Sequence, residues 1–370
     1  MDPVLFPPQG VLDSGVGTAF PGAVACVWAQ GEPLFHQPVG HRALIPRAIP
    51  NTTGTVYDLA SLTKAMAVGT LLMKAVADGL LTLDEPVSAR LSCTVSHWDA
   101  ITIRHLASHC SGLPAWADLS KWLVDGHPTV APGSSEARSL IQCRVLDTPL
   151  ESVPGTRTQY SDLGFLLLGW ILEETMGAPL DALFQWVRRE FDLKNTSYRR
   201  LGLPPTPEIA PTEDCPMRQR VLTGEVHDPN AWMLGGVAGH AGLFGTAADV
   251  ALWGKVLLDI WQGRDGRLPP EIVRQFWSPD ASPSSETTTW RLCFDGVSSQ
   301  GSSTGQYFGS KAVGHLGFTG TSIWLEPEID LVVVLLSNRV HPTVVEEPPI
   351  KAFRPRFHDA MYKAFGILGR

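Results

Sequence analysis

The sequence predicts an α+β protein of two domains, in which helices flank an antiparallel β-sheet and a mostly helical domain is inserted into the chain. Apolar runs typical of strands occur near both ends, and the segment between them indicates helices joined by Pro/Gly loops. A chain of 370 residues also exceeds what one simple core usually contains. The expected units are a sheet domain of residues 1–84 and 235–370, and an inserted helical domain of residues 85–234.

The first part of the chain contains a predicted hairpin and two predicted helices. Residues 22–45 hold two apolar-rich runs around QGEP, which is typical of a β-hairpin. Apolar side chains then recur at helical spacing from Ser61 to Leu81, and Gly79 suits the end of that helix. Residues 102–114 indicate a shorter helix that stops at a Gly and a Pro.

Later segments predict more helices and a second hairpin. The clearest helices of the middle run over 163–177 and 180–191, and another is expected at 247–262. Residues 317–340 predict a hairpin with EPEID at its turn, and a helix at 352–367 closes the chain. The second arm of the hairpin is an unbroken apolar run, so we expect that strand to be buried on both faces.

Composition and charge exclude several classes of partner. The net charge is −8, and no stripe of Lys and Arg appears, which argues against a nucleic-acid or anionic-membrane partner. The apolar runs are too short to span a bilayer, and the first residues lack a signal-like pattern. Six cysteines without a C-x-x-C pair are expected to be buried thiols in a reducing compartment. We therefore expect a cytoplasmic protein, of undetermined oligomeric state.

The stretch YDLASLTKAM places Ser61 and Lys64 three residues apart at the start of a predicted helix. At that spacing the two side chains share one helix face. The unpaired N–H groups of a helix N-terminus can stabilise an oxyanion, and a lysine in a closed site can act as a base. The pair is thus a workable nucleophile and base. S-x-x-K alone is a weak signal, because a capping serine with a solvated lysine gives the same pattern.

Two further segments add polar residues that suit a cleft. TQYSDLGFLLLGW places Tyr160 and Asp162 just before an apolar helix, and AVGHLGFTGTSIW places His315 and Gly317 at the head of the predicted hairpin. S-x-x-K, then Y-S-x, then H-x-G, in this order, resemble the motifs of serine hydrolases related to class C β-lactamases. That group includes penicillin-binding DD-peptidases and the family VIII carboxylesterases. Similar segments extend from residue 57 to residue 342.

The resemblance implies a β-lactamase/DD-peptidase-like fold and a role for each matching residue. Ser61 would be acylated, Lys64 would take its proton, and Tyr160 would share the proton transfers. Which of Lys64 and Tyr160 is the base in each step stays open. The backbone N–H groups of Ser61 and Phe318 would form the oxyanion hole. No metal or organic cofactor is implied.

Two departures from the family pattern bear on the substrate. Asp162 stands where β-lactamases and DD-peptidases commonly have asparagine, and a carboxylate cannot donate to a peptide carbonyl. Asp162 either faces the site and holds Lys64 protonated, or turns away to cap the following helix. His315-Leu316-Gly317 replaces the K-T-G whose lysine and threonine grip a substrate carboxylate. Arg339 could supply a replacement charge.

Other motifs carry weaker signals. GSSTG matches the nucleophile elbow G-x-S-x-G but lies in a Ser/Gly-rich segment rather than between a strand and a helix. His105 and His109 have zinc-ligand spacing but lack the H-E-x-x-H glutamate. His240 lies in a glycine-rich run and is expected to line the pocket, with His227 a weaker candidate. Three tryptophans in loop-like contexts are candidates for an acyl-pocket wall: Trp116, Trp232 and Trp290.

Together these observations favour a carboxylesterase that cleaves small-molecule esters through an acyl-enzyme on Ser61, with room for weak β-lactamase activity. The expected substrate-binding residues are Asp162, His240, His315 and Gly317. One alternative is a β-lactamase or D-Ala-D-Ala carboxypeptidase-type enzyme. Others are an acyltransferase and a catalytically inactive relative that only binds.

Overall fold

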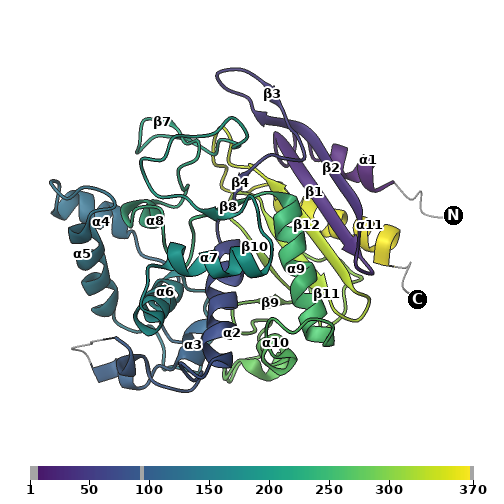
Figure 1. The fold of residues 1–370 in the computed structure, drawn as a ribbon. Helices are drawn as coiled ribbons and strands as arrows, with labels where there is room; N and C mark the ends of the chain where they lie inside the picture. The colour runs from purple at the N-terminus through teal and green to yellow at the C-terminus, as the bar shows by residue number, and fades with distance from the viewer. Residues whose placement is uncertain (1–6, 92–95, 367–370) are drawn as a thin grey trace.

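A computed structural model describes residues 7–91 and 96–366 and contains one large sheet covered by helices on both faces (Figure 1). The sheet has seven antiparallel strands in the order β3-β2-β1-β12-β11-β10-β9. The strands are β1 (Gly22–Ala29), β2 (Glu32–Ala43), β3 (Ile49–Pro50), β9 (Asp295–Gly296), β10 (Val313–Leu316), β11 (Ser322–Glu326) and β12 (Leu331–Ser337). β1 pairs with β12, so the expectation that both ends of the chain share one antiparallel sheet is confirmed.

Alternate residues of the central strands face two different cores. On β12, Val332, Val334 and Leu336 belong to the larger core, into which α9 (Ala247–Gln262) also packs. Leu331, Val333 and Leu335 belong to a second core with α1 (Pro8–Asp13) and α11 (Ile350–Phe365). All seven residues of β12 are buried, which fits its unbroken apolar sequence.

The larger core continues into the helical part of the molecule, where α6 (Asp162–Met176) is its most buried helix. Every residue from Leu163 to Leu172 on α6 is buried. The other helices are the π-helix η1 (Lys64–Gly69), α2 (Thr70–Ala77), η2 (Val87–Ala89), η3 (Ser96–Asp99), α3 (Ile103–Ala107), α4 (Leu119–Gly126), α5 (Ser135–Leu146), α7 (Leu180–Glu190), α8 (Pro229–Met233), α10 (Pro270–Trp277) and η4 (Pro279–Ala281).

Two small sheets lie beside these helices. One joins β4 (Tyr57–Asp58), β8 (Leu243–Gly245) and β5 (Ser197–Tyr198), and the other joins β6 (Asp214–Cys215) and β7 (Arg220–Val221). In the first, β5 of the proposed inserted domain pairs with β8 of the proposed sheet domain. The two proposed domains therefore interlock, and their boundaries at 84/85 and 234/235 stay a prediction.

Most predicted elements occur within a few residues of their expected bounds. The helix expected from Ser61 begins as a π-helix at Lys64 and ends at Ala77, before Gly79 at φ +68°. The last helix spans Ile350–Phe365 rather than 352–367, and residue 367 lies outside the described residues.

The prediction of buried cysteines is wrong for Cys143, which is exposed on α5. Cys26, Cys110, Cys215 and Cys293 are buried free thiols, and Cys93 lies outside the described residues. Burial raises the pKa of Cys26 to about 12, despite an opposing contact with Trp28.

Among the described residues, no single helix has the length and apolar character to cross a membrane. Only α6 and α7 together meet that test of length and composition, and the pair bends by 81°.

Candidate active site

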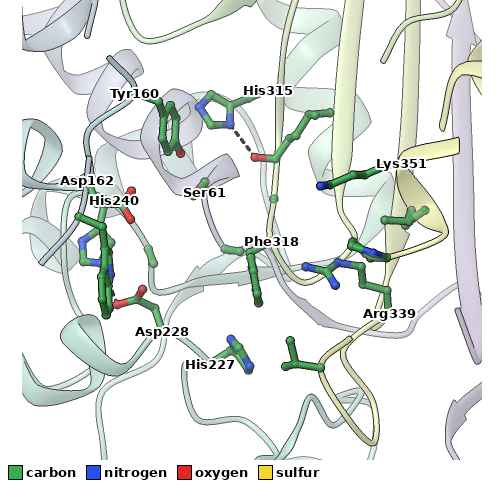
Figure 2. Close-up of a pocket in the computed structure, with 18 of the residues that line it drawn as sticks. Ser61, Tyr160, Asp162, His227, Asp228, His240, His315, Phe318, Arg339 and Lys351 are labelled. Carbon is green, nitrogen blue, oxygen red and sulfur yellow. Dashed lines mark hydrogen bonds and ion pairs between the residues drawn. The ribbon is translucent and has the colours of Figure 1, made fainter. Parts of the chain in front are cut away.

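The residues expected to form a site meet at one cleft of about 770 Å³ between the sheet and the helices (Figure 2). Seven of the eight candidate side chains or loop positions line this cleft: Ser61, Tyr160, Asp162, His240, His315, Gly317 and Phe318. The eighth, Lys64, is completely buried next to Ser61. Asp162 and His240 lie on one side of Ser61, and Arg339 and Lys351 lie on the other (Figure 2).

The turn that carries Ser61 is held in place from two directions. Ala60, just before the serine, has a positive φ of 48°, and its N–H donates to Asp58 Oδ1 at 2.8 Å. The hydroxyls of Thr319 and Thr321, in the loop after β10, donate to the backbone carbonyls of Asp58 and Leu59 at 2.7 and 3.0 Å. A strained residue fixed by several bonds is common beside a reactive side chain, because the surrounding contacts offset the strain.

Lys64 is the polar centre of the site. Its Nζ lies 2.9 Å from Ser61 Oγ, 3.1 Å from the His240 carbonyl oxygen and 2.6 Å from Asp162 Oδ1. Burial lowers the pKa of Lys64, but the charge of Asp162 and the hydrogen bonds of Asp162 and Tyr160 outweigh it, so the net pKa is raised. Lys64 is therefore an ammonium near neutral pH.

Of the two alternatives for Asp162, the structure shows the one in which the carboxylate faces the site. The helix cap is provided by Ser161, whose Oγ accepts from the Gly164 N–H. Asp162 is the first residue of α6 and turns toward Lys64. The carboxylate is thus engaged with the lysine.

The three neighbours of Lys64 suit either of its protonation states. A carboxylate and a carbonyl can only accept hydrogen bonds, whereas the Ser61 hydroxyl can donate or accept. An ammonium would donate to all three oxygens. A neutral amine would donate to Asp162 and His240 and accept from Ser61, which is the arrangement of a base. Loss of one proton thus activates the pair without any rearrangement.

Tyr160 lies against Lys64 in an aromatic wall. Lys64 Nζ is 4.9 Å from the centre of the Tyr160 ring. The ring centres of His109 and Trp290 lie 4.5 and 5.2 Å from the centre of the Tyr160 ring. Burial raises the pKa of Tyr160, and Lys64 offsets this only in part. The phenol is therefore neutral near pH 7 and can donate a proton or pass one on.

His105 and His109, which have zinc-ligand spacing, each accept a hydrogen bond from the backbone in the structure. His105 accepts the Thr102 N–H in a capping box at the start of α3. His109 is buried and accepts the Ser161 N–H at 3.1 Å, which helps to fix the loop that carries Tyr160. Within residues 7–91 and 96–366, no group of three or more His, Cys, Asp or Glu side chains is arranged to hold a metal ion.

The H-L-G element forms the edge of the cleft at β10. His315 Nδ1 donates to the Leu316 carbonyl at 2.8 Å, and burial with the nearby Lys64 charge lowers its pKa to about 3. The imidazole is thus neutral at physiological pH. Gly317 is required by space, because a Cβ there would lie 2.0 Å from Thr321 Oγ1 and 2.7 Å from the Leu59 carbonyl oxygen.

The proposed oxyanion donors are available for a ligand. Neither the Ser61 N–H nor the Phe318 N–H donates to any protein acceptor in the described part of the chain. Gly317 and Gly320, on either side of Phe318, donate to Thr321 and Gly317. Ser61 and Phe318 line the same cleft, and their unpaired N–H groups suit the stabilisation of a developing negative charge.

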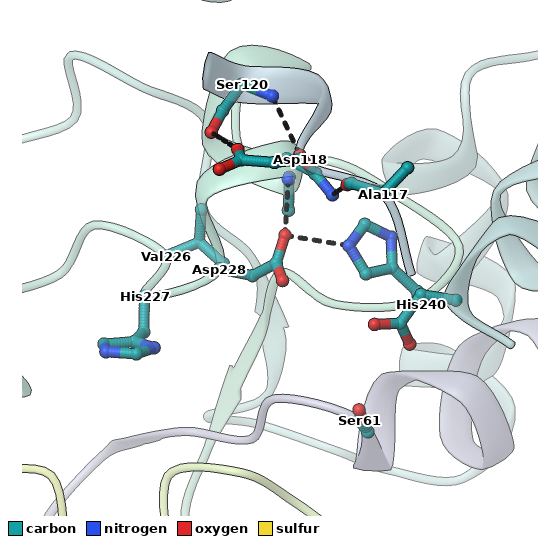
Figure 3. Close-up of polar contacts among 12 residues, drawn as sticks. Ser61, Ala117, Asp118, Ser120, Val226, His227, Asp228 and His240 are labelled. Atoms are coloured by element: carbon teal, nitrogen blue, oxygen red, sulfur yellow. Dashed lines mark hydrogen bonds and ion pairs between the residues drawn. The ribbon is translucent and has the colours of Figure 1, made fainter. Parts of the chain in front are cut away.

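His240 and Asp228 form a second polar pair next to the site (Figure 3). His240 Nε2 donates to Asp228 Oδ1 at 2.8 Å, and the same carboxylate caps α8 by accepting the Ala231 N–H. Burial raises the pKa of Asp228, but His240 and the Ala231 N–H outweigh it and leave the pKa below its usual range. His240 thereby presents its carbonyl to Lys64 in a fixed position.

The far side of the cleft is formed by an exposed aromatic ring and cationic side chains. Phe318 is 52% exposed, and the Arg339 guanidinium lies 4.4 Å from its ring centre. His227 stacks on the same ring at 5.5 Å and pairs with Glu213. Of the three tryptophans proposed as walls, Trp116 and Trp290 line the cleft, whereas Trp232 packs against Arg218.

The sequence and fold of the chain match those of known proteins. The model of the family described as "Beta-lactamase" matches residues 10–352. The chain belongs to the beta-lactamase family. The family and its neighbours identify it as a serine hydrolase with the β-lactamase/penicillin-binding-protein fold, as the resemblance of the motifs implied.

Two relatives and two solved structures are similar to the chain. The chain is 31% identical over 364 residues to an "N-acetylmuramyl-L-alanine amidase" of Bacillus subtilis, covering 91% of this chain and 81% of that one. It is 30% identical over 326 residues to a "putative D-alanyl-D-alanine carboxypeptidase" of Escherichia coli, covering 82% and 73%. "EstCE1, a hydrolase with promiscuous acyltransferase activity" superposes with a TM-score of 0.75 at 21% identity, covering 96% and 97%. A penicillin-binding protein homologue from Pyrococcus abyssi gives 0.73 at 20%, covering 98% and 76%. At these identities the two structures establish the fold alone.

Proposed function

We propose that this member of the family cleaves small carboxylic esters through an acyl-enzyme on Ser61. One observation carries the proposal: Ser61 Oγ lies 2.9 Å from Lys64 Nζ in a cleft that Ser61 and Phe318 both line, and neither of their backbone N–H groups donates to an acceptor in the described part of the chain. A nucleophile, a base and oxyanion donors are the parts that acyl transfer needs.

The reaction uses the proton positions described above. With Lys64 neutral, Ser61 Oγ attacks the ester carbonyl and Lys64 takes the hydroxyl proton. The Ser61 and Phe318 N–H groups stabilise the oxyanion. The carbon–oxygen bond to the leaving alcohol then breaks, and the proton passes from Lys64 to the alcohol directly or through Tyr160. Water attacks the acyl-enzyme in the same way and releases the acid.

Esters are favoured over β-lactams by the chemistry of the β10 edge. His315 is neutral and Leu316 has no hydroxyl, so this edge offers no side-chain charge or donor comparable to K-T-G. Asp162 is engaged with Lys64 and as a carboxylate cannot donate to an amide carbonyl. A small ester depends on neither contact.

A second candidate is cleavage of an amide bond in a cell-wall peptide. It is supported by the two relatives at 30–31% identity, which are named as a muramyl-L-alanine amidase and a putative D-Ala-D-Ala carboxypeptidase. The cleft of about 770 Å³ has room for more than a short acyl chain.

A parallel substrate panel tests the proposal. The purified protein is assayed with 4-nitrophenyl esters of two to eight carbons, nitrocefin, a D-Ala-D-Ala peptide and N-acetylmuramyl-L-alanine. Ester turnover with kcat/KM well above that for nitrocefin and both amides supports the first candidate. Preferential release of D-Ala or L-Ala supports the second, and turnover of nitrocefin above all others contradicts both.

A further inference from the structure

Asp58, three residues before Ser61, is a buried residue that does not line the cleft. It is 2% exposed, and each of its three oxygens accepts a hydrogen bond. Oδ1 accepts the Ala60 N–H at 2.8 Å, Oδ2 accepts the His227 N–H at 2.7 Å, and the carbonyl oxygen accepts from the Thr319 hydroxyl at 2.7 Å. One residue therefore joins the turn that carries Ser61, the segment before α8 and the loop after β10.

The bond to Ala60 sets the direction of the first oxyanion donor. Ala60 has φ +48°, a left-handed conformation that is unfavourable for a residue with a Cβ. Asp58 Oδ1 stabilises this conformation by accepting the N–H group two residues further on, as aspartate commonly does in turns. The Ser61 N–H belongs to the planar peptide unit that follows Ala60. Its direction therefore depends on the backbone torsions that Asp58 holds in place.

The other two bonds of Asp58 reach the residue that carries the second oxyanion donor, Phe318. Thr319, which directly follows Phe318, is tied to the Asp58 carbonyl through its hydroxyl. His227, whose N–H donates to Asp58 Oδ2, stacks on the Phe318 ring with 5.5 Å between the ring centres. Phe318 is thus held at its backbone and at its ring by residues bonded to Asp58. The positions of both N–H donors therefore depend on the same buried residue.

We propose that Asp58 is the positioning residue of the oxyanion hole, which holds the Ser61 and Phe318 N–H groups at a fixed separation without touching the substrate. This rests on the proposed acyl-enzyme chemistry and adds to it the residue that arranges the two donors. Donors that are already in place stabilise a developing negative charge without reorganisation during the reaction. A displacement of about 1 Å in such a group can lower the rate by about 100-fold.

The arrangement needs a carboxylate, because both side-chain oxygens of Asp58 accept from N–H groups. Asparagine has the same shape but only one acceptor oxygen, so its NH2 group would face the N–H of either Ala60 or His227. Asp58→Asn therefore breaks one of these two contacts with little change in volume. Thr319→Val is a second variant, which removes the hydroxyl bond to the Asp58 carbonyl and leaves the carboxylate in place.

Two inhibitors separate stabilisation of the oxyanion from binding of the uncharged molecule. Ser61 Oγ adds to the carbonyl carbon of trifluoroacetophenone, its proton passes to Lys64, and the ketone oxygen becomes an oxyanion. The corresponding alcohol, α-(trifluoromethyl)benzyl alcohol, has the same apolar groups but cannot form this adduct. In Asp58→Asn we expect kcat/KM for 4-nitrophenyl acetate to fall by about 100-fold and the inhibition constant of the ketone to rise by about the same factor. The inhibition constant of the alcohol should change by less than about threefold, because the alcohol forms no oxyanion.

Glu326→Gln is the matched control for the loss of a buried carboxylate. Glu326 is 1% exposed, does not line the cleft and accepts the Gly309 and Glu328 N–H groups through its two oxygens. It is the last residue of β11, whereas the loop after β10 leads into the first residue of that strand. This variant should have a lower Tm, as Asp58→Asn should, but wild-type kcat/KM and wild-type inhibition by the ketone. A loss of stability alone changes the amount of active enzyme and not the inhibition constant.

The outcomes distinguish the two proposals. Wild-type kinetics in a folded Asp58→Asn variant, or a fall in kcat/KM without weaker inhibition by the ketone, overturns the role of Asp58 alone. If Asp58→Asn does not fold, Thr319→Val decides: the inhibition constant of the ketone should rise by at least about tenfold, and an unchanged constant overturns the same role. A wild-type protein that neither cleaves the ester nor is inhibited by the ketone contradicts the ester-cleaving function itself.

Discussion

Replacing Asp162 by asparagine should move the pH dependence of the enzyme toward lower pH. The Asp162 carboxylate lies 2.6 Å from Lys64 Nζ and helps to hold the lysine pKa above its usual value. Lys64 must be neutral to accept the Ser61 proton, so kcat/KM rises as the pH increases through the pKa of Lys64. Asparagine removes the negative charge, and burial, which favours the neutral amine, then dominates.

The magnitude follows from the short distance and partial exposure of this pair. At 2.6 Å two unit charges attract by about 6 kcal/mol at an effective dielectric constant of 20. The Asp162 side chain is 18% exposed, so solvent weakens this attraction. An opposite charge this close commonly changes a pKa by about one to three units. We therefore expect the midpoint of the acidic limb of the kcat/KM profile to shift to lower pH by that amount, equivalent to about 1.4–4 kcal/mol.

The assay is kcat/KM for a neutral ester between pH 5 and pH 10, for wild type, Asp162→Asn and Glu346→Gln. Glu346 lines the same cleft but is not among the causes of the raised pKa of Lys64. Its variant should therefore have the same acidic limb of the kcat/KM profile as the wild type. An acidic limb that stays in place or moves to higher pH in Asp162→Asn would contradict the control of the Lys64 pKa by Asp162.

Three further predictions concern residues around Ser61 and Lys64 that shape the site. Asp228→Ala should lower the free energy of unfolding at pH 7 by at least about 1 kcal/mol, because a helix cap is lost. The folded-state pKa of Asp228 is depressed, so this difference should shrink as the pH falls below about 4 in urea titrations. Gly317→Ala should abolish ester turnover because its Cβ would overlap the Leu59 carbonyl, whereas Gly266→Ala, in open space, should keep it. His315 should remain neutral from pH 5 to pH 9 by NMR; titration near pH 6.5 would contradict the lowering of its pKa by burial and by the Lys64 charge.

Much of the site could be predicted because its chemistry is carried by short motifs. Ser61 and Lys64 are three residues apart at a helix start, so local geometry alone places one beside the other. Tyr160 and His315 required the family resemblance, because nothing local shows that two loops more than 150 residues apart meet. The structure brings both to the cleft.

The parts that sequence analysis left open depend on tertiary contacts. Asp162 could face the site or cap α6, and the choice was decided by Ser161, which caps the helix, and by the buried Lys64 opposite. Asp228 was not among the candidate site residues, yet its contact with His240 holds the His240 carbonyl against Lys64. The contact between Asp228 and His240 forms only when α8 and the glycine-rich loop that carries His240 are both folded.

The same limit applies to the fold. The unbroken apolar run of β12 predicts burial on both faces but not which helices cover them. The interlocking of β5 with β8 also has no sequence signal, since each strand has only two or three residues. Cys143 lies on an exposed face of α5, a helix whose weak amphipathic pattern did not reveal which face is buried.

The most direct test of the central claim is the intact mass of the protein after brief exposure to an activated ester and to a fluorophosphonate. We expect one adduct per chain with each reagent, located on Ser61 by peptide mapping, and none in Ser61→Ala. An adduct that persists in a folded Ser61→Ala variant, or a wild-type protein that forms none, would contradict an acyl-enzyme on Ser61.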